Sequence, residues 1–281
     1  MKQGVNNTLT AKRRTLNGYY LVDEDDNEVL LPNKYVPSGL SPGDEISVFI
    51  YKDSEDRIIA TTIEPLIFLN EFAILEVVDI NPVGAFMDWG LEKELLVPYS
   101  EQIQRMKVGS SYPIYLYLDD KTDRLVGTGK TDRYLEKEDI TVKTGQEVDL
   151  LICNQTDIGI NVIINNIHSG LLYDNELFQA VSPGDRITGY IKNIRPDMKI
   201  DVSLQKQGYA SVEPNAAKIL QKLKDNNGFL NLTDKSDPVI ILAKLEMSKK
   251  VFKKAIGSLY KQKLIRLEKD GIYLIDETMN E

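Results

Sequence analysis

The chain contains almost no cysteine or histidine, two residues on which many catalytic and metal sites depend. It has one cysteine, Cys153, and one histidine, His168, among 281 residues. One cysteine excludes an intrachain disulfide and argues against a zinc site supplied by this protein alone. A Gly-x-Ser-x-Gly turn, a Walker loop and a Gly-rich dinucleotide turn are all missing from the sequence. The sequence therefore predicts a non-enzymatic protein without a cofactor or a metal.

The single cysteine and the single histidine are themselves predicted to have no chemical role. Cys153 lies in the apolar run VDLLICN and reads as a buried strand residue. His168 lies in the segment NNIHSGL, which we interpret as a surface turn.

Long apolar runs are also absent. No stretch approaches the roughly 18 apolar residues of a membrane helix. The N-terminal segment MKQGVNNTLTAKRR is basic but is followed by no apolar core, so it does not read as a secretory signal. We therefore expect a cytoplasmic protein with no membrane partner.

Acidic residues outnumber basic ones, and the net charge is unevenly distributed. The net charge is −9, of which residues 1–210 carry −12 and residues 211–281 carry +3. Nucleic-acid affinity rests largely on the neutralisation of phosphates. Any binding of nucleic acid must therefore come from local faces of the molecule rather than from its overall charge.

What the sequence does contain is an internal repeat. Gly18 and Pro32 reappear 66 residues later as Gly84 and Pro98, and the text NGYYLVDEDDNEVLLP parallels VGAFMDWGLEKELLVP. A weaker third copy begins near Asp157. A repeat of this length indicates several small structural units in a row.

Each repeat has the pattern of a small β-barrel. Apolar residues alternate in EISVFIY and YPIYLYL, which is typical of strands with one buried face. Five short strands in about 70 residues predict an OB-type barrel. We expect a multidomain, mainly β protein, with five-stranded OB-type domains at residues 1–64, 65–140 and 141–212.

The remaining residues, 213–281, change to a helical period. Gly228 is a natural end for one helix, Ser236 or Asp237 a cap for the second, and Ser248 a cap for the third. A hairpin turning at Asp270 and Gly271 follows. This order predicts a winged helix-turn-helix domain.

Aromatic and basic residues recur at related places in the three barrels. OB barrels that bind nucleic acid stack bases on outer aromatic rings and hold phosphates with nearby cations. Strand alternation directs one of Tyr19 and Tyr20 inward. The candidate rings and cations are Tyr19, Tyr20, Phe86, Trp89, Tyr173, Arg57, Arg124 and Lys199.

The segments GAFMDWG, LLVPYSEQ and VGSSYPIYLYLDDKTDRLVGT resemble the S-one domain, an RNA-binding OB repeat. The resemblance implies RNA-facing residues at Tyr20, Asp53 and Arg57, at Phe86, Asp119 or Asp120, and Arg124, and at Tyr173, Asp197 and Lys199. Pro32 and Pro98 stand where the family has a histidine, so each of these modules lacks one stacking side chain and should bind weakly.

The chain as a whole resembles the conserved virulence factor B family. The most specific segment is DKSDPVIILAKLEMSKKVFKKAIGSLYKQKLI, in the predicted winged helix. The resemblance implies RNA binding and post-transcriptional control of gene expression, virulence genes included, with no catalytic activity.

The third predicted helix carries a row of lysines, which leaves more than one function open. Lys250, Lys254 and Lys261 oppose its apolar stripe, and Lys253 lies beside them. We expect the row to contact the phosphates of single-stranded RNA, the predicted partner. The alternatives are a solvated helix face, a DNA-binding regulator that uses the winged helix, and a protein-interaction scaffold. The sequence indicates no oligomeric state.

Overall fold

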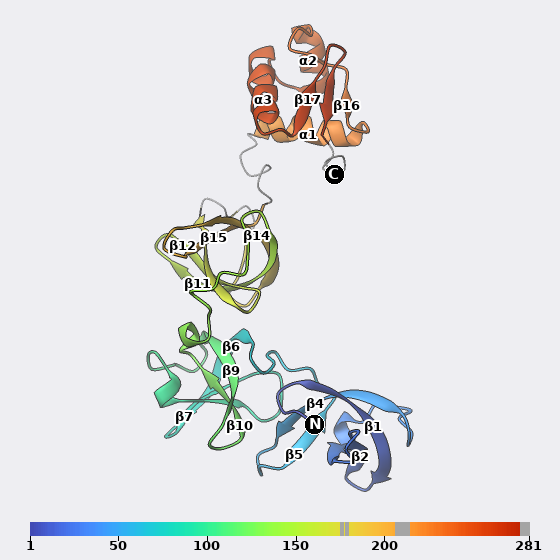
Figure 1. Cartoon of the computed structure of the whole chain (residues 1–281), viewed down its shortest axis with the longest axis vertical. Helices are drawn as coiled ribbons and strands as arrows, with labels where there is room; N and C mark the ends of the chain where they lie inside the picture. Colours follow the sequence, from blue (N-terminus) through green and yellow to red (C-terminus); the bar gives the residue numbers. More distant parts are fainter. Residues whose placement is uncertain (175–176, 178–179, 206–213, 276–281) are drawn as a thin grey trace. The chain divides into compact units, whose positions relative to one another are not determined.

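The computed structural model describes residues 1–174, 177, 180–205 and 214–275. The chain divides into two compact units, Met1–Leu204 and Gln205–Glu281 (Figure 1). The first unit is built from strands, and the second has helices beside a small sheet. The boundary predicted between residues 212 and 213 lies outside the described residues.

The first and third modules are closed five-stranded barrels. In each, the strands are ordered 1-2-3-5-4 around the barrel. The first barrel comprises β1 (Asn6–Thr15), β2 (Gly18–Val22), β3 (Glu28–Pro32), β4 (Glu45–Lys52) and β5 (Ile58–Thr61). The third barrel comprises β11 (Glu147–Thr156), β12 (Gly159–Ile164), β13 (His168–Tyr173), β14 (Arg186–Ile194) and β15 (Ile200–Ser203). Short 3₁₀ turns lie at η1 (Asn33–Tyr35), η2 (Tyr99–Glu101) and η3 (Thr131–Arg133).

The second module differs from the expected closed barrel. Its strands form an open sheet in the order β10-β9-β6-β7-β8, which we call the half-barrel. Closure is marginal even in the first barrel, where β3 and β5 share the single residue pair Leu30 and Ile59. A Cβ on Gly127 would lie 2.9 Å from the Val97 side chain, so β10 and β8 are close neighbours without a hydrogen-bonded ladder. The half-barrel comprises β6 (Phe72–Asn81), β7 (Gly84–Met87), β8 (Leu95–Pro98), β9 (Ser111–Asp119) and β10 (Arg124–Thr128).

The repeated glycine and proline turn out to be partners across two strands. Gly18 pairs with Pro32 between β2 and β3, and Gly84 pairs with Pro98 between β7 and β8. A Cβ on Gly18 would lie 2.0 Å from the carbonyl oxygen of Leu31. Only glycine permits this close approach of the two strands, which explains why the residue recurs in each module.

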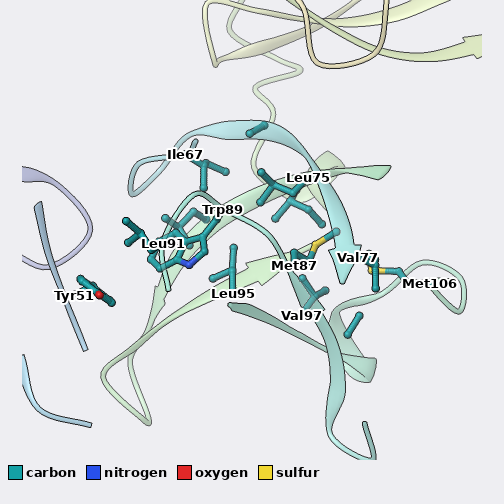
Figure 2. Close-up of a cluster of buried hydrophobic side chains, with 14 of the residues drawn as sticks. Tyr51, Ile67, Leu75, Val77, Met87, Trp89, Leu91, Leu95, Val97 and Met106 are labelled. Carbon is teal, nitrogen blue, oxygen red and sulfur yellow. The ribbon is translucent and has the colours of Figure 1, made fainter. Parts of the chain in front are cut away.

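Strand β4 is buried on both faces, whereas its alternation predicted one. Val48 and Ile50 pack inside the first barrel. Phe49 and Tyr51 point the other way and belong to the apolar core of the half-barrel. Figure 2 shows Tyr51 approaching that core from a separate segment, beside Leu91. The first barrel and the half-barrel therefore share one hydrophobic cluster.

The prediction that His168 is a surface turn residue is wrong, because the side chain is fully buried at the start of β13. Its Nδ1 lies 3.1 Å from the carbonyl oxygen of Glu136, and its Nε2 accepts a hydrogen bond from the amide of Thr141 at 3.3 Å. Through these two contacts, the imidazole links residues 136–141 to the third barrel. The prediction for Cys153 is confirmed, since the thiol is buried and burial raises its pKa to about 12.

We expect His168→Ala to destabilise the third barrel by about 2–4 kcal/mol, because it empties a buried site and leaves the Thr141 amide and the Glu136 carbonyl without this partner. Urea denaturation followed by hydrogen exchange in β13 would measure the loss. Ser169→Ala, at the exposed neighbouring position, is the control and should change stability little. Equal stability of the two variants would contradict this role.

The second unit is a winged helix with the predicted caps. The Asp237 side chain accepts from the amide of Val239 at 2.8 Å, and that of Ser248 accepts from the amide of Val251 at 3.3 Å. The sheet has the order β16-β18-β17, so the expected two-stranded wing gains a third strand. The elements are α1 (Pro214–Asp225), β16 (Phe229–Leu230), α2 (Pro238–Leu245), α3 (Lys249–Lys261), β17 (Ile265–Leu267) and β18 (Ile272–Leu274).

Candidate nucleic-acid interface

Each of the three β modules has a groove on the same outer face. The groove runs over the second and third strands of the module and is bordered by the hairpin that joins its fourth and fifth strands. The first groove has a volume of about 890 Å³, the second about 350 Å³ and the third about 540 Å³. This is the face on which OB folds bind oligonucleotides.

The first groove brings together three residues predicted from the sequence, Tyr20, Asp53 and Arg57. Alternation on β2 turns Tyr19 into the barrel, where its hydroxyl donates to the carbonyl oxygen of Leu40 at 2.9 Å. Tyr20 consequently faces outward and is half-buried. The ring that could stack on a base is therefore Tyr20.

Two neighbouring side chains hold the first groove in shape. The guanidinium of Arg13 lies 4.0 Å from the centre of the Tyr20 ring, a cation–π contact that the sequence did not reveal. The Asp53 carboxylate accepts from Arg57 Nε at 2.9 Å and from Arg57 Nη2 at 2.7 Å. Burial raises the pKa of Asp53, but Arg57 and two backbone amides outweigh it and hold the pKa below its usual value. Asp53 thus orients the Arg57 fork at the edge of the groove.

The second groove contains Phe86, Trp89 and Arg124 among its lining residues. Ala85 and Met87 turn into the core, so Phe86 faces outward and is half-buried. The Arg124 guanidinium forms an ion pair with Asp56 from the β4–β5 hairpin of the first barrel. Phe86 is therefore available at the groove, whereas Arg124 is engaged across the boundary between modules.

Trp89, predicted to face RNA, is instead part of the hydrophobic core. Its side chain is only 2% exposed and lies among Leu91, Leu95 and Ile67 (Figure 2). The ring meets that of Phe49 edge-on at a centroid distance of 5.8 Å, and its Nε1 donates to the carbonyl oxygen of Lys93. The prediction is wrong because the tryptophan packs between two modules. A comparison of the repeats, each taken as a single module, does not show such a contact.

The third groove has a different chemistry. Lys199 lines it as predicted, but no aromatic ring is among its described lining residues, and Tyr173 bonds through its hydroxyl to Arg195. The Arg195 Nε donates to both carboxylate oxygens of Asp201 at 3.0 Å. Sequence reasoning missed this Arg195–Asp201 pair, and its only signal is an aspartate inside the apolar strand β15. The described lining of this groove therefore offers cations rather than a stacking surface.

Helix α3 presents its lysines away from the core of the winged helix. Phe252, Ala255, Ile256 and Leu259 are buried on one side. The opposite side is exposed, and Lys253 Nζ there lies 3.9 Å from an Asp234 carboxylate oxygen. The lysines on this exposed side are Lys250, Lys253, Lys254 and Lys261.

The part of the chain that the structure describes contains neither a metal cluster nor a membrane-spanning helix. Among residues 1–174, 177, 180–205 and 214–275, no group of histidine, cysteine and carboxylate side chains could hold a metal ion. None of the helices in these ranges is long and apolar enough to cross a membrane.

Comparison with known proteins identifies related domains. Residues 3–63 and 71–130 match the S1 (S-one) domain, and residues 217–274 match the CvfB-like winged helix domain. Neither of these is an enzyme family. A multidomain protein with nucleic acid binding domains from Streptococcus pneumoniae, known from a crystal structure, is 24% identical, with a TM-score of 0.45 and coverage of 97% of this chain and 98% of that one.

Two curated relatives are similar over most of their length. The protein YitL of Bacillus subtilis is 29% identical, over 97% of this chain and 94% of its own. Conserved virulence factor B of Staphylococcus epidermidis is 24% identical, over 92% of this chain and 85% of its own. With its tandem S1 domains and CvfB-like winged helix, the chain belongs to the conserved virulence factor B family.

Proposed function

We propose that this protein binds single-stranded RNA in the cytoplasm and regulates gene expression after transcription, without catalysing a reaction. The observation that carries the proposal is the groove repeated on one outer face of all three β modules. Tyr20 and Phe86 face outward at two of these grooves, as base stacking requires. Since a named relative is a virulence factor, virulence genes are among the proposed targets.

The affinity of each groove alone is expected to be modest. Arg57 is paired with Asp53, and Lys34 with Glu92, so a phosphate at the first groove must compete with carboxylates. Tandem modules compensate for weak single sites, because binding at one raises the effective concentration at the next.

A competition experiment tests the proposed function. A fluorescent single-stranded RNA bound to the full-length protein should be displaced by unlabelled single-stranded RNA and poorly by duplex DNA of the same length. Photocrosslinking should attach the RNA to peptides containing β2 and β7. Failure of the RNA to bind would refute the proposal, and preferential displacement by duplex DNA would favour a DNA-binding regulator.

Binding of duplex DNA is the second candidate, since α3 is the recognition helix in a helix-turn-helix. The exposed side of α3 carries lysines, which contact phosphates and can also bind guanine, but α3 has no Arg, Asn or Gln, the other side chains that commonly pair with base edges. Gln262, just beyond α3, is half-buried and its side-chain amide donates to the Ser258 hydroxyl. The helix is therefore better suited to contact that does not depend on sequence.

We expect the double variant Lys250→Glu/Lys254→Glu to weaken binding of single-stranded RNA. Each phosphate that α3 no longer neutralises should also reduce the slope of log affinity against log salt by about 0.7. A salt titration followed by fluorescence anisotropy would measure both effects. The double variant Lys222→Glu/Lys244→Glu, at exposed positions on α1 and α2, makes the same change in net charge and is the control. An unchanged slope in the α3 double variant would show that α3 does not contact the RNA phosphates.

A further inference from the structure

The first and second grooves are joined to each other. Three residues, Tyr51, Ser54 and Lys93, line both of them. Tyr51 and Ser54 come from the first barrel, and Lys93 comes from the segment between β7 and β8 of the half-barrel. A chain lying in one groove can therefore continue into the other without leaving the surface.

The boundary between these two modules is a packed interface. Phe49 and Tyr51 of the first barrel share a hydrophobic cluster with Trp89 of the half-barrel, and Figure 2 shows Tyr51 beside this cluster. Around the cluster, Lys52 pairs with Asp123 at 2.7 Å. Asp123 is exposed, and ion pairs open to solvent contribute little to stability, so the buried rings are expected to supply most of the energy that holds the two grooves in register.

Lys93 differs from the other cations that line the two grooves. Its Nζ donates to the carbonyl oxygens of Lys52 at 3.1 Å and Asp53 at 2.7 Å. The nearest carboxylate oxygen, on Asp56, is 4.0 Å away, beyond hydrogen-bond range. The remaining lining cations each contact a carboxylate more closely, namely Lys34 with Glu92, Lys52 with Asp123, Arg57 with Asp53 and Arg124 with Asp56.

The charge of Lys93 is therefore incompletely compensated. The two carbonyl bonds use two of the three N–H groups of the ammonium. Burial lowers the pKa of Lys93, and the distant Asp56 offsets this only in part. An anion bound at the boundary would supply the negative charge and the third hydrogen-bond acceptor that the Lys93 ammonium lacks. A phosphodiester has both the charge and the acceptor oxygens.

We propose that one single-stranded RNA segment crosses from the first groove to the second, and that Lys93 binds the phosphate at the crossing. The first barrel and the half-barrel then act as one binding unit that runs from Tyr20 to Phe86. This inference rests on the proposed RNA-binding function and adds the path of the strand.

The test uses full-length protein and oligouridylates of about 4, 8, 12 and 16 nucleotides, since one OB fold covers about 4–16 nucleotides. Lys93→Met should weaken binding of the longest oligomer about tenfold and of the shortest little, and should lower the salt slope for the longest by about 0.7. Lys93→Arg should keep most of the affinity. Lys107→Met, at an exposed position of the half-barrel outside both grooves and the hairpins that border them, is the matched control.

The outcomes separate the two proposals. If the wild-type protein binds none of the oligomers, the proposed function fails. If it binds them but Lys93→Met behaves like Lys107→Met, or loses affinity equally at all lengths, the crossing is refuted. Should Lys93→Met have a lowered melting temperature, crosslinking decides: in the wild-type protein, 4-thiouridine at the middle of the longest oligomer should attach to the peptide containing Lys93 or Ser54, and attachment elsewhere would refute the path.

Discussion

Replacing both Tyr20 and Phe86 by alanine is expected to reduce the affinity for single-stranded RNA by at least about 30-fold. Each ring faces outward, lines its groove and is half-buried. Stacking contributes about 1–3 kcal/mol per base. Losing two stacked bases at the lower limit costs about 2 kcal/mol, which corresponds to about 30-fold in affinity. Fluorescence anisotropy with an oligouridylate long enough to span both grooves would measure it.

Conservative variants distinguish stacking from a change in the fold. Tyr20→Phe and Phe86→Tyr keep the rings and should retain affinity close to that of the wild-type protein. The double alanine variant should keep its circular dichroism spectrum, because neither side chain belongs to the buried core. If a folded double alanine variant kept the affinity of the wild-type protein, RNA bases would not stack on these two rings.

The features of the fold that were predictable are those with a local signal. The order of strands follows from alternation and from the repeated glycine, whose pairing with Pro32 or Pro98 recurs at one offset. The caps at Asp237 and Ser248 likewise follow from residue type and position. Alternation alone left the outward position to either Tyr19 or Tyr20, the resemblance to the S-one domain favoured Tyr20, and the burial of Tyr19 agrees with that choice.

The features that were not predictable depend on contacts between modules. Trp89 resembles an exposed stacking residue within its own repeat, but the rings of Phe49 and Tyr51 cover it from the neighbouring barrel. Arg124 likewise meets Asp56 of that barrel. His168 bonds to a segment some thirty residues earlier in the chain, so its immediate neighbours suggested a surface turn. None of these contacts has a signature in the period of a single strand.

The largest loss of stability is expected from Gly18→Ala. The residue has a φ of +150°, which side-chain-bearing residues rarely adopt, and its new Cβ would lie 2.0 Å from the Leu31 carbonyl oxygen and 2.9 Å from the Pro32 Cα. Both contacts are with backbone, so relief requires β2 and β3 to separate. We expect destabilisation of the first barrel by about 4 kcal/mol, among the larger effects of single substitutions.

Gly257→Ala provides the opposite case within the same chain. Gly257 lies inside α3, and a Cβ there would meet nothing within 4 Å. Alanine favours the helix, so this variant should be more stable than the wild-type protein by about 0.5–1 kcal/mol. Hydrogen exchange in β2 and β3 should therefore accelerate in Gly18→Ala and stay unchanged in Gly257→Ala. If exchange in β2 and β3 of Gly18→Ala were as slow as in the wild-type protein, these strands would tolerate a side chain at their closest approach. Close packing would then not explain why the glycine is repeated.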